Sequence, residues 1–353
     1  MDQGDMEFDR LSSLFSDSKS VINISRDRKD SLTSFTSSIS SAEESSNDNE
    51  LEQFGNNHTL KWQNIIDNWE QYKKKRNFLN EFLLLGIPDE KRPFVWPLCS
   101  LSYELNLNPT YSNILGMESG FEKLIQRDIC RTYPNNEFFK DKNGPGQKSL
   151  FNVMKAYSIY DPEVGYCQGS AFIAGILLLR LDEENSFKVL VKLMYEYRLR
   201  ELYKPCMTEL GVCMHQIEGL VNDFLPDLQL HFVSNSFGPS LYASAWFLTL
   251  FSTSCSLDFA MRVLDMFLSE GLNIIFKLSL GILKVYESTL RSMDLESMVN
   301  FLQHDLMSQT VDGFQGIIDA ALKFKLNQKR LKKLEKEYRE ILSQEKLEQT
   351  ELR

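Results

Sequence analysis

Residues 170–195, which read SAFIAGILLLRLDEENSFKVLVKLMY, indicate the fold class of this chain. Residues 170–181 are almost continuously apolar, and residues 183–195 carry apolar side chains three and four positions apart. This spacing places apolar side chains on one face of a helix, and the polar residues between the two segments separate them. The stretch therefore predicts two consecutive helices, Ser170–Leu181 and Glu183–Tyr195.

The same pattern continues on both sides of this stretch, from residue 89 to about residue 322. Apolar-periodic segments alternate with short turn signals such as Asp161-Pro162 and Gly238-Pro239. Alternating runs bounded by Asn-Gly or Asp-Gly, which are typical of β-hairpins, are absent, and no fixed-period repeat is visible. We therefore predict an all-α fold. The other predicted helices are Trp62–Phe82, Lys148–Ile159, Gly211–Leu225, Leu241–Phe251, Leu257–Ser269, Leu272–Leu290 and Asp294–Leu302.

Composition and charge exclude several classes of protein. The 353 residues are 42% hydrophobic, and 49 acidic against 39 basic residues give a net charge of −10. This acidic balance argues against nucleic acid as the main partner. The apolar runs stop short of the roughly 20 residues that cross a bilayer, and the polar N-terminus does not resemble a signal peptide. Six cysteines without a CxxC pair indicate reduced thiols rather than disulfides or a zinc site, so we expect a cytoplasmic protein.

The two ends of the chain differ from its middle. Residues 1–58 are rich in Ser and acidic residues and poor in apolar ones, so we predict a disordered tail, in which Ser45 and Ser46 beside acids are candidates for phosphorylation. The basic run Lys73–Arg76 reads as a solvated helix face rather than a contact with anionic lipid. Residues 323–353 are highly charged, with Leu331, Leu334, Tyr338 and Ile341 at heptad-like spacing. A solvated helix and the start of a coiled coil, hence a weak dimer, fit this segment equally well.

Motifs of enzymes that carry their own machinery are missing. Gly144-Pro-Gly146-Gln-Lys148-Ser149 lacks the Gly-Lys-Ser ending of a phosphate loop, and no strand precedes it. HExxH, GxSxG, GxGxxG and kinase signatures do not occur. The four histidines lack metal-ligand spacing, and no particular histidine is indicated as a base for Cys167. We therefore expect neither a metal nor a cofactor of the chain's own.

Two polar segments remain as candidates for function. In the first, Ile125-Gln-Arg-Asp128-Ile129-Cys-Arg131, the residues Asp128 and Arg131 are three apart and can pair on one helix face. An ordinary surface ion pair fits this spacing as well. In the second, Val164-Gly165-Tyr166-Cys167-Gln168-Gly169, a Gln lies next to small residues that permit close approach of another molecule. A Gln amide can hold a water molecule, although a simple turn or cap residue also fits.

Together these segments resemble the TBC domain of Rab GTPase-activating proteins. Gly86-Ile-Pro88 with Arg92-Pro-Phe-Val-Trp96 is similar to the entry motif of that domain, residues 125–131 match IxxDxxR, and Tyr166-Cys-Gln168 matches YxQ. Later blocks follow in the family's order at 202–207, 243–251 and 262–271. The trailing charged segment resembles the ecotropic viral integration site five-like subgroup, which has a C-terminal coiled coil. The resemblance implies a V-shaped domain of two helical subdomains over residues 59–322.

The resemblance also implies roles for individual residues. Arg131 would be an arginine finger inserted in trans into a GTP-bound Rab, and Gln168 would position the attacking water. Asp128 would orient Arg131. The supporting residues would be Arg92, Trp96, Tyr166, Gly165 and Gly169.

On this interpretation the chain is a GTPase activator and not itself an enzyme. Mg²⁺ and GTP would belong to the Rab, and the chain would reach endomembranes through its partners to regulate vesicle trafficking. The alternative is a non-catalytic scaffold that binds a Rab or an effector without accelerating hydrolysis.

Overall fold

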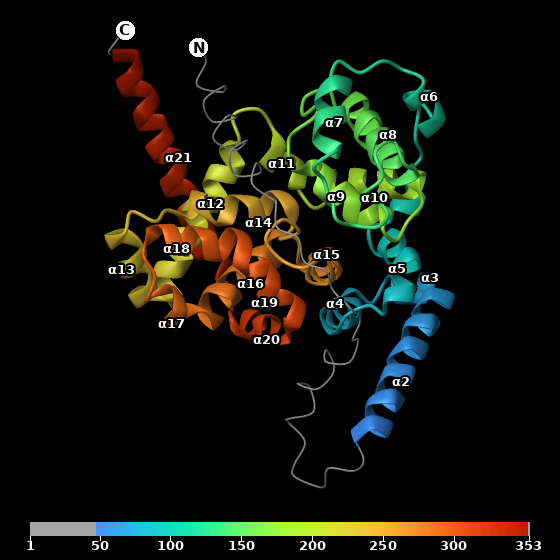
Figure 1. Ribbon diagram of the computed structural model, residues 1–353, viewed down its shortest axis with the longest axis horizontal. Coiled ribbons are helices and arrows are strands. Elements are labelled where there is room, and N and C mark those ends of the chain that lie inside the picture. The colour runs from blue at the N-terminus through green and yellow to red at the C-terminus, as the bar shows by residue number, and fades with distance from the viewer. Residues whose placement is uncertain (1–46, 352–353) are drawn as a thin grey trace.

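The computed structural model describes residues 47–351, and these are helices joined by turns and loops, with no strand among them (Figure 1). The predicted all-α fold is confirmed. Within the described range no helix combines the length and the apolar composition that crossing a bilayer requires. The first 46 residues of the predicted tail lie outside the described residues.

The N-terminal helices differ from the prediction in two ways: the first begins earlier, and the predicted single helix is divided. Helix α2 already begins at Asn47, so the last part of the predicted tail is helical. The single helix predicted over Trp62–Phe82 is divided, because Asn68 leaves the helical conformation and donates to the carbonyl of Asn64 (3.0 Å). Trp62 is fully buried and its indole N–H donates to the carbonyl of Gly86 (2.9 Å), which fixes α2 on the domain. The segments are α2 (Asn47–Asp67), α3 (Trp69–Tyr72) and α4 (Arg76–Leu85).

A first group of helices surrounds the stretch 170–195. Helix α9 is buried along its whole length between α8, α10 and α14, which explains why its sequence is apolar all round. Helix α10 is capped by the Asp182 carboxylate, which accepts from the backbone N–H of Asn185 (2.9 Å). The group consists of α5 (Arg92–Cys99), α6 (Tyr111–Leu115), α7 (Glu122–Ile129), α8 (Pro145–Tyr160), α9 (Ser170–Leu178), α10 (Glu183–Tyr195) and α11 (Leu199–Tyr203).

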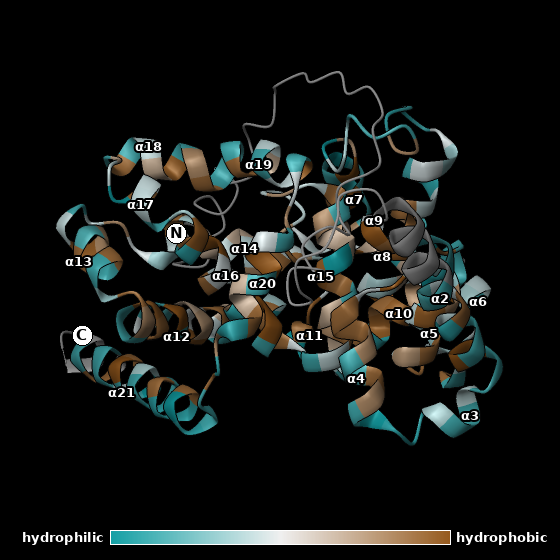
Figure 2. Ribbon diagram, turned by 90° about the horizontal axis from the view of Figure 1, so that it is seen from below, coloured by the Kyte–Doolittle hydropathy of each residue, from teal (hydrophilic) through white to brown (hydrophobic). Residues whose placement is uncertain are grey.

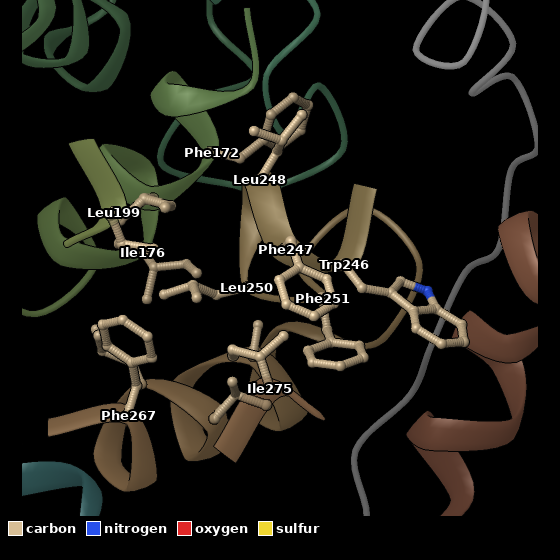
Figure 3. Packing of buried hydrophobic residues seen from close by; sticks show 14 of the residues in the cluster. Phe172, Ile176, Leu199, Trp246, Phe247, Leu248, Leu250, Phe251, Phe267 and Ile275 are labelled. Atoms are coloured by element: carbon tan, nitrogen blue, oxygen red, sulfur yellow. The ribbon is translucent and has the colours of Figure 1, made fainter. Parts of the chain in front are cut away.

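A second group follows in the sequence and packs around α16 (Figure 1). Aromatic side chains fill its core, and Figure 3 shows Trp246, Phe247 and Phe251 close together with Ile275 opposite them. The predicted helix Leu272–Leu290 is divided at Tyr286. The group consists of α12 (Thr208–Phe224), α13 (Pro226–Ser234), α14 (Ala243–Thr249), α16 (Leu272–Val285), α17 (Glu287–Leu290), α18 (Leu295–Asn300), α19 (Leu306–Asp312) and α20 (Gln315–Lys323).

Helix α15 (Leu257–Glu270) joins the two groups, because it packs on α4, α5 and α9 as well as on α16 and α19. It carries two buried charged residues, Arg262 and Asp265, into this junction. Arg262 donates to the carbonyl of Leu83 (2.9 Å) at the end of α4. The relative position of the two groups therefore depends on polar contacts of α15 as well as on apolar packing.

The C-terminal helix α21 (Gln328–Glu351) lies along α12 of the same chain (Figure 2). Leu331 and Leu334 are buried there, and Leu334 packs where Gly219 has no side chain. The first two heptad-like positions thus face the domain, because α12 offers them apolar surface. Tyr338 also lies against α12, beside Gly211, while Ile341 is 42% exposed.

Candidate functional site

Helix α7 places Asp128 and Arg131 at one end of the first group. Ile125 and Ile129 are buried and anchor the helix, as their spacing predicts. Asp128 is 4% exposed and lies on the buried side, whereas Arg131 follows the last helical turn. The backbone N–H of Arg131 donates to the carbonyl of Asp128 (3.1 Å), and its side-chain Nε binds the Asp128 carboxylate. The Arg131 side chain is 30% exposed.

The Asp128 carboxylate connects the two segments that the sequence singles out. One of its oxygens binds Arg131 Nε, and the other accepts from the Tyr166 hydroxyl. Tyr166 is buried, and this burial together with the negative charge of Asp128 raises its pKa well above the ordinary value. The hydroxyl therefore stays protonated and continues to donate at neutral pH. The predicted support roles of Asp128 and Tyr166 rest on this shared carboxylate.

The loop between α8 and α9 needs glycine at two positions. Gly165 has φ +61° and Gly169 has φ +101°, both in the left-handed region that L residues rarely adopt. A Cβ on Gly165 would lie 2.3 Å from the ring of Phe121, which covers the loop at the start of α7. Both glycines thus shape the loop that carries Gln168.

Gln168 is 8% exposed, and its side-chain Nε2 has no hydrogen-bond partner within the described part of the chain. A buried amide without a partner costs roughly 1–3 kcal/mol. The neighbouring Cys167 is not an alternative nucleophile. Burial raises the pKa of its thiol to about 12, which keeps it protonated.

Arg92 and Trp96 lie in a different polar cluster, at the contact between α5 and α15. Arg92 binds the Asp265 carboxylate through Nε (3.1 Å) and Nη2 (2.9 Å), and its Nη1 binds Asp89 (2.8 Å). The indole N–H of Trp96 donates to the same Asp265 carboxylate (2.8 Å). The structure thus places these two residues at the junction of the helix groups, and their hydrogen bonds described here go to Asp265 and Asp89.

Sequence reasoning missed the residues that hold the loop from the other side. Asp161 reads as a turn residue before Pro162, yet it is 1% exposed and accepts hydrogen bonds from Arg200 and Tyr157. Arg200 lies 39 positions away, so no local pattern connects the two. The described residues contain no group of His, Cys, Asp and Glu side chains suited to a metal ion.

Comparison with known proteins places this geometry in a family. The model of the Rab-GTPase-TBC domain matches residues 89–291. The chain is 46% identical over 341 residues to the Ecotropic viral integration site 5 protein homolog of Homo sapiens, covering 96% of this chain and 41% of that protein. It is 47% identical over 293 residues to Rab GTPase-activating protein eat-17 of Caenorhabditis elegans, covering 83% of this chain and 33% of that protein. The chain therefore spans less than half the length of these relatives.

Solved structures share the fold. The TBC domain of a Chlamydomonas flagellar RabGAP superposes with a TM-score of 0.63 at 25% identity, covering 75% of this chain and 94% of that one. The Ypt/Rab-GAP domain of Gyp1p gives a TM-score of 0.59 at 19% identity, covering 70% and 91%. The arrangement of helices around the site is thus that of TBC domains.

Proposed function

This chain belongs to the Rab-GTPase-TBC domain family, and on this premise we propose that it accelerates GTP hydrolysis by Rab GTPases with Arg131 and Gln168 supplied in trans. The observation that carries the proposal is the buried Asp128 carboxylate, which binds both Arg131 and Tyr166. It places the arginine and the Gln168 loop in one hydrogen-bonded unit at a partly exposed position.

Arg131 supplies positive charge where the transferred phosphoryl group gathers negative charge. An arginine inserted in this way contributes about 10³–10⁵ in rate, or roughly 4–7 kcal/mol of the barrier. Asp128 holds Nε, which orients the planar guanidinium before the partner arrives. A lysine at this position would lack the two-point contact of a guanidinium with phosphate oxygens.

Gln168 positions the attacking water. Its amide can accept from the water through the carbonyl oxygen and donate to the partner through Nε2, the atom that is buried without a hydrogen bond. A preformed, water-poor position reduces the reorganisation needed when the Rab docks. The unpaired donor is therefore consistent with a group that finds its partner only in the complex.

These roles of Arg131 and Gln168 require a partner that supplies the nucleotide. The Rab binds GTP and Mg²⁺, and the chain contributes side chains without a cofactor of its own. We expect it to act in the cytoplasm, to reach endomembranes through its Rab, and so to regulate vesicle trafficking. Complementarity between the surfaces of the two proteins decides which Rab is the substrate.

The test is single-turnover GTP hydrolysis across a panel of GTP-loaded Rabs with wild type, Arg131→Ala and Gln168→Ala. We expect one or a few Rabs to be accelerated by the wild type, with the rate lost in both variants. Arg339→Ala serves as a control, because Arg339 lies on α21 and pairs with Glu209 and Glu335. Binding of a Rab with no acceleration by the wild type would contradict the proposal and favour the scaffold alternative.

A further inference from the structure

We propose that Arg200 on α11 is a positioning residue for Gln168, acting by clamping the loop of residues 161–165 that leads into it. The inference rests on the proposed function, since it concerns the group that positions water. Arg200 lies outside the motifs singled out in the sequence, and its side chain is only 13% exposed.

The clamp begins with a forked contact on a buried carboxylate. Arg200 donates to Asp161 through Nε (2.6 Å) and through Nη2 (2.8 Å), and Asp161 is 1% exposed. The Tyr157 hydroxyl donates to the same carboxylate (3.0 Å) from the last turn of α8. Two parallel hydrogen bonds from one guanidinium fix direction as well as distance. Asp161 is therefore held from α8 and from α11 at once.

Asp161 in turn closes the loop that follows it. Its backbone carbonyl accepts from the N–H of Gly165 (2.7 Å), and its carboxylate lies 3.5 Å from the N–H of Val164. Arg200 Nη2 also binds Glu163, so one guanidinium holds two residues of this turn. Lys204, the residue directly after α11, has its Nζ 3.7 Å from the Glu163 carboxylate and adds a second cation.

The turn ends three residues before Gln168. Gly165 leaves it with φ +61°, after which Tyr166 reaches Asp128 and Gln168 follows. Apart from the bond between Gly165 and Asp161, the contacts at its two ends decide where the side chains of this loop point. Tyr166 holds one end on α7, and Arg200 holds the other end through Asp161.

The experiment uses the full chain and a Rab that the wild type accelerates. Arg200→Met is expected to lower kcat by about 10- to 100-fold and to leave KM for the GTP-loaded Rab unchanged. Displacing a catalytic group such as Gln168 by about 1 Å lowers the rate by this order of magnitude. Arg200→Lys, which keeps the charge but loses the fork, is expected to fall between Arg200→Met and the wild type.

Arg330→Met is the matched control. Arg330 on α21 makes the same kind of forked contact, donating to the Asp223 carboxylate on α12 through Nε (2.7 Å) and Nη2 (3.1 Å). Its kcat should equal that of the wild type. When Gln168→Ala is already present, adding Arg200→Met should lower kcat by less than a further factor of about two, because the side chain that Arg200 positions is already gone.

The inference is overturned if Arg200→Met keeps the wild-type kcat while Arg131→Ala is inactive, which leaves the proposed function intact. It is also overturned if Arg200→Met lowers kcat equally with and without Gln168. If the wild type accelerates no Rab, the proposed function fails and this inference with it. Should Arg200→Met not fold, as shown by its thermal unfolding, Arg200→Lys against Arg330→Lys decides by the same criteria.

Discussion

Two regions of the molecule contain the same three chemical groups, an arginine, a carboxylate and an aromatic donor. At the junction of the helix groups these are Arg92, Asp265 and Trp96, and at the candidate site they are Arg131, Asp128 and Tyr166. The Arg92 side chain is 10% exposed and its Asp265 carboxylate is 0% exposed, whereas Arg131 is 30% exposed.

The difference lies in where the guanidinium points. Arg92 uses three nitrogens on two carboxylates, Asp265 and Asp89, and so holds α5 on α15 inside one molecule. Arg131 is tied through Nε to a carboxylate beneath it, at a partly exposed position. On the proposed function, the same chemistry stabilises the fold in one place and prepares a side chain for a partner in the other. Variants of the two clusters should accordingly separate stability from activity.

The largest effect is expected for Arg131→Ala. We predict a loss of Rab-stimulated GTP hydrolysis of about 10³–10⁵-fold. The free energy of unfolding should fall less than in Arg92→Ala, because water can reach Asp128 once this partly exposed side chain is removed. Single-turnover hydrolysis and urea unfolding of the same preparation measure both quantities. Arg131→Lys should be nearly as inactive, and retention of most activity by it would contradict the proposed role of the guanidinium.

The next effect is expected for Arg92→Ala, and on stability. It leaves the buried Asp265 carboxylate with the Trp96 N–H and the charge of nearby Arg262. Removing one partner of a buried ion pair costs about 3–5 kcal/mol, and we expect a loss at the lower end of this range because Arg262 remains. Urea unfolding should show this loss in the midpoint. Arg291→Ala, which removes an exposed pair with Asp227, is the control and should change stability by about 0–1 kcal/mol. Equal losses in both variants would contradict the assignment of Arg92 to the junction.

Within the first group the sequence predicts α8, α9 and α10 well, because long buried helices leave a strong apolar signal. Glu183–Tyr195 has the predicted bounds, and α9 begins at the predicted Ser170. The divisions at Asn68 and Tyr286 were missed, since single residues that leave the helical conformation hardly change apolar periodicity. The packing of α21 on α12 was missed for a different reason. A heptad-like stripe indicates an apolar face without indicating which surface covers it.

For the candidate site, residue spacing predicted a contact within one segment, whereas it could not predict contacts between segments that are distant in the sequence. Asp128 and Arg131 are three residues apart, so their pairing could be predicted. The contact of Asp128 with Tyr166 joins residues 38 positions apart, and the family resemblance implied a supporting role for each without indicating that they touch. Neither source indicated the contact of Asp161 with Arg200. For Arg92 and Trp96 the resemblance implied support of the site without indicating that Asp265 would receive them both.

A smaller effect is expected for Asp128→Asn. An Asn offers one acceptor oxygen in place of two, so it cannot receive both Arg131 and Tyr166 in the present arrangement. We predict a kcat lower by about 10²-fold, as for a misplaced catalytic group, with little change in KM. The control is Glu137→Gln, since Glu137 pairs with Lys140 at the same three-residue spacing on the exposed surface. An unchanged kcat for Asp128→Asn would show that Arg131 needs no orienting carboxylate.

The smallest effect is on stability at acidic pH. It compares Asp161, which lies next to the Gln168 loop, with Asp89, which lies next to the junction of the helix groups. Burial opposes ionisation of Asp161, but hydrogen bonds from Arg200 and Tyr157 outweigh it and lower the pKa of this carboxyl below its ordinary value. Burial likewise opposes ionisation of Asp89, and Arg180 and Arg92 lower its pKa. A carboxyl with a lowered folded-state pKa contributes stability that is fully present above the unfolded pKa of about 3.9 and is lost as pH falls through the folded value.

The thermal midpoint of the wild type should therefore decrease as the pH falls below about 4. Asp161→Asn should start from a lower midpoint at pH 6 and show a shallower decrease between pH 6 and pH 3. Asp89→Asn should flatten the decrease less, because its side chain is 51% exposed and solvent screens its pairs with Arg92 and Arg180. A greater flattening by Asp89→Asn than by Asp161→Asn would mean that the carboxylate beside the junction, rather than the one that holds the Gln168 loop, is the more strongly coupled to its arginines.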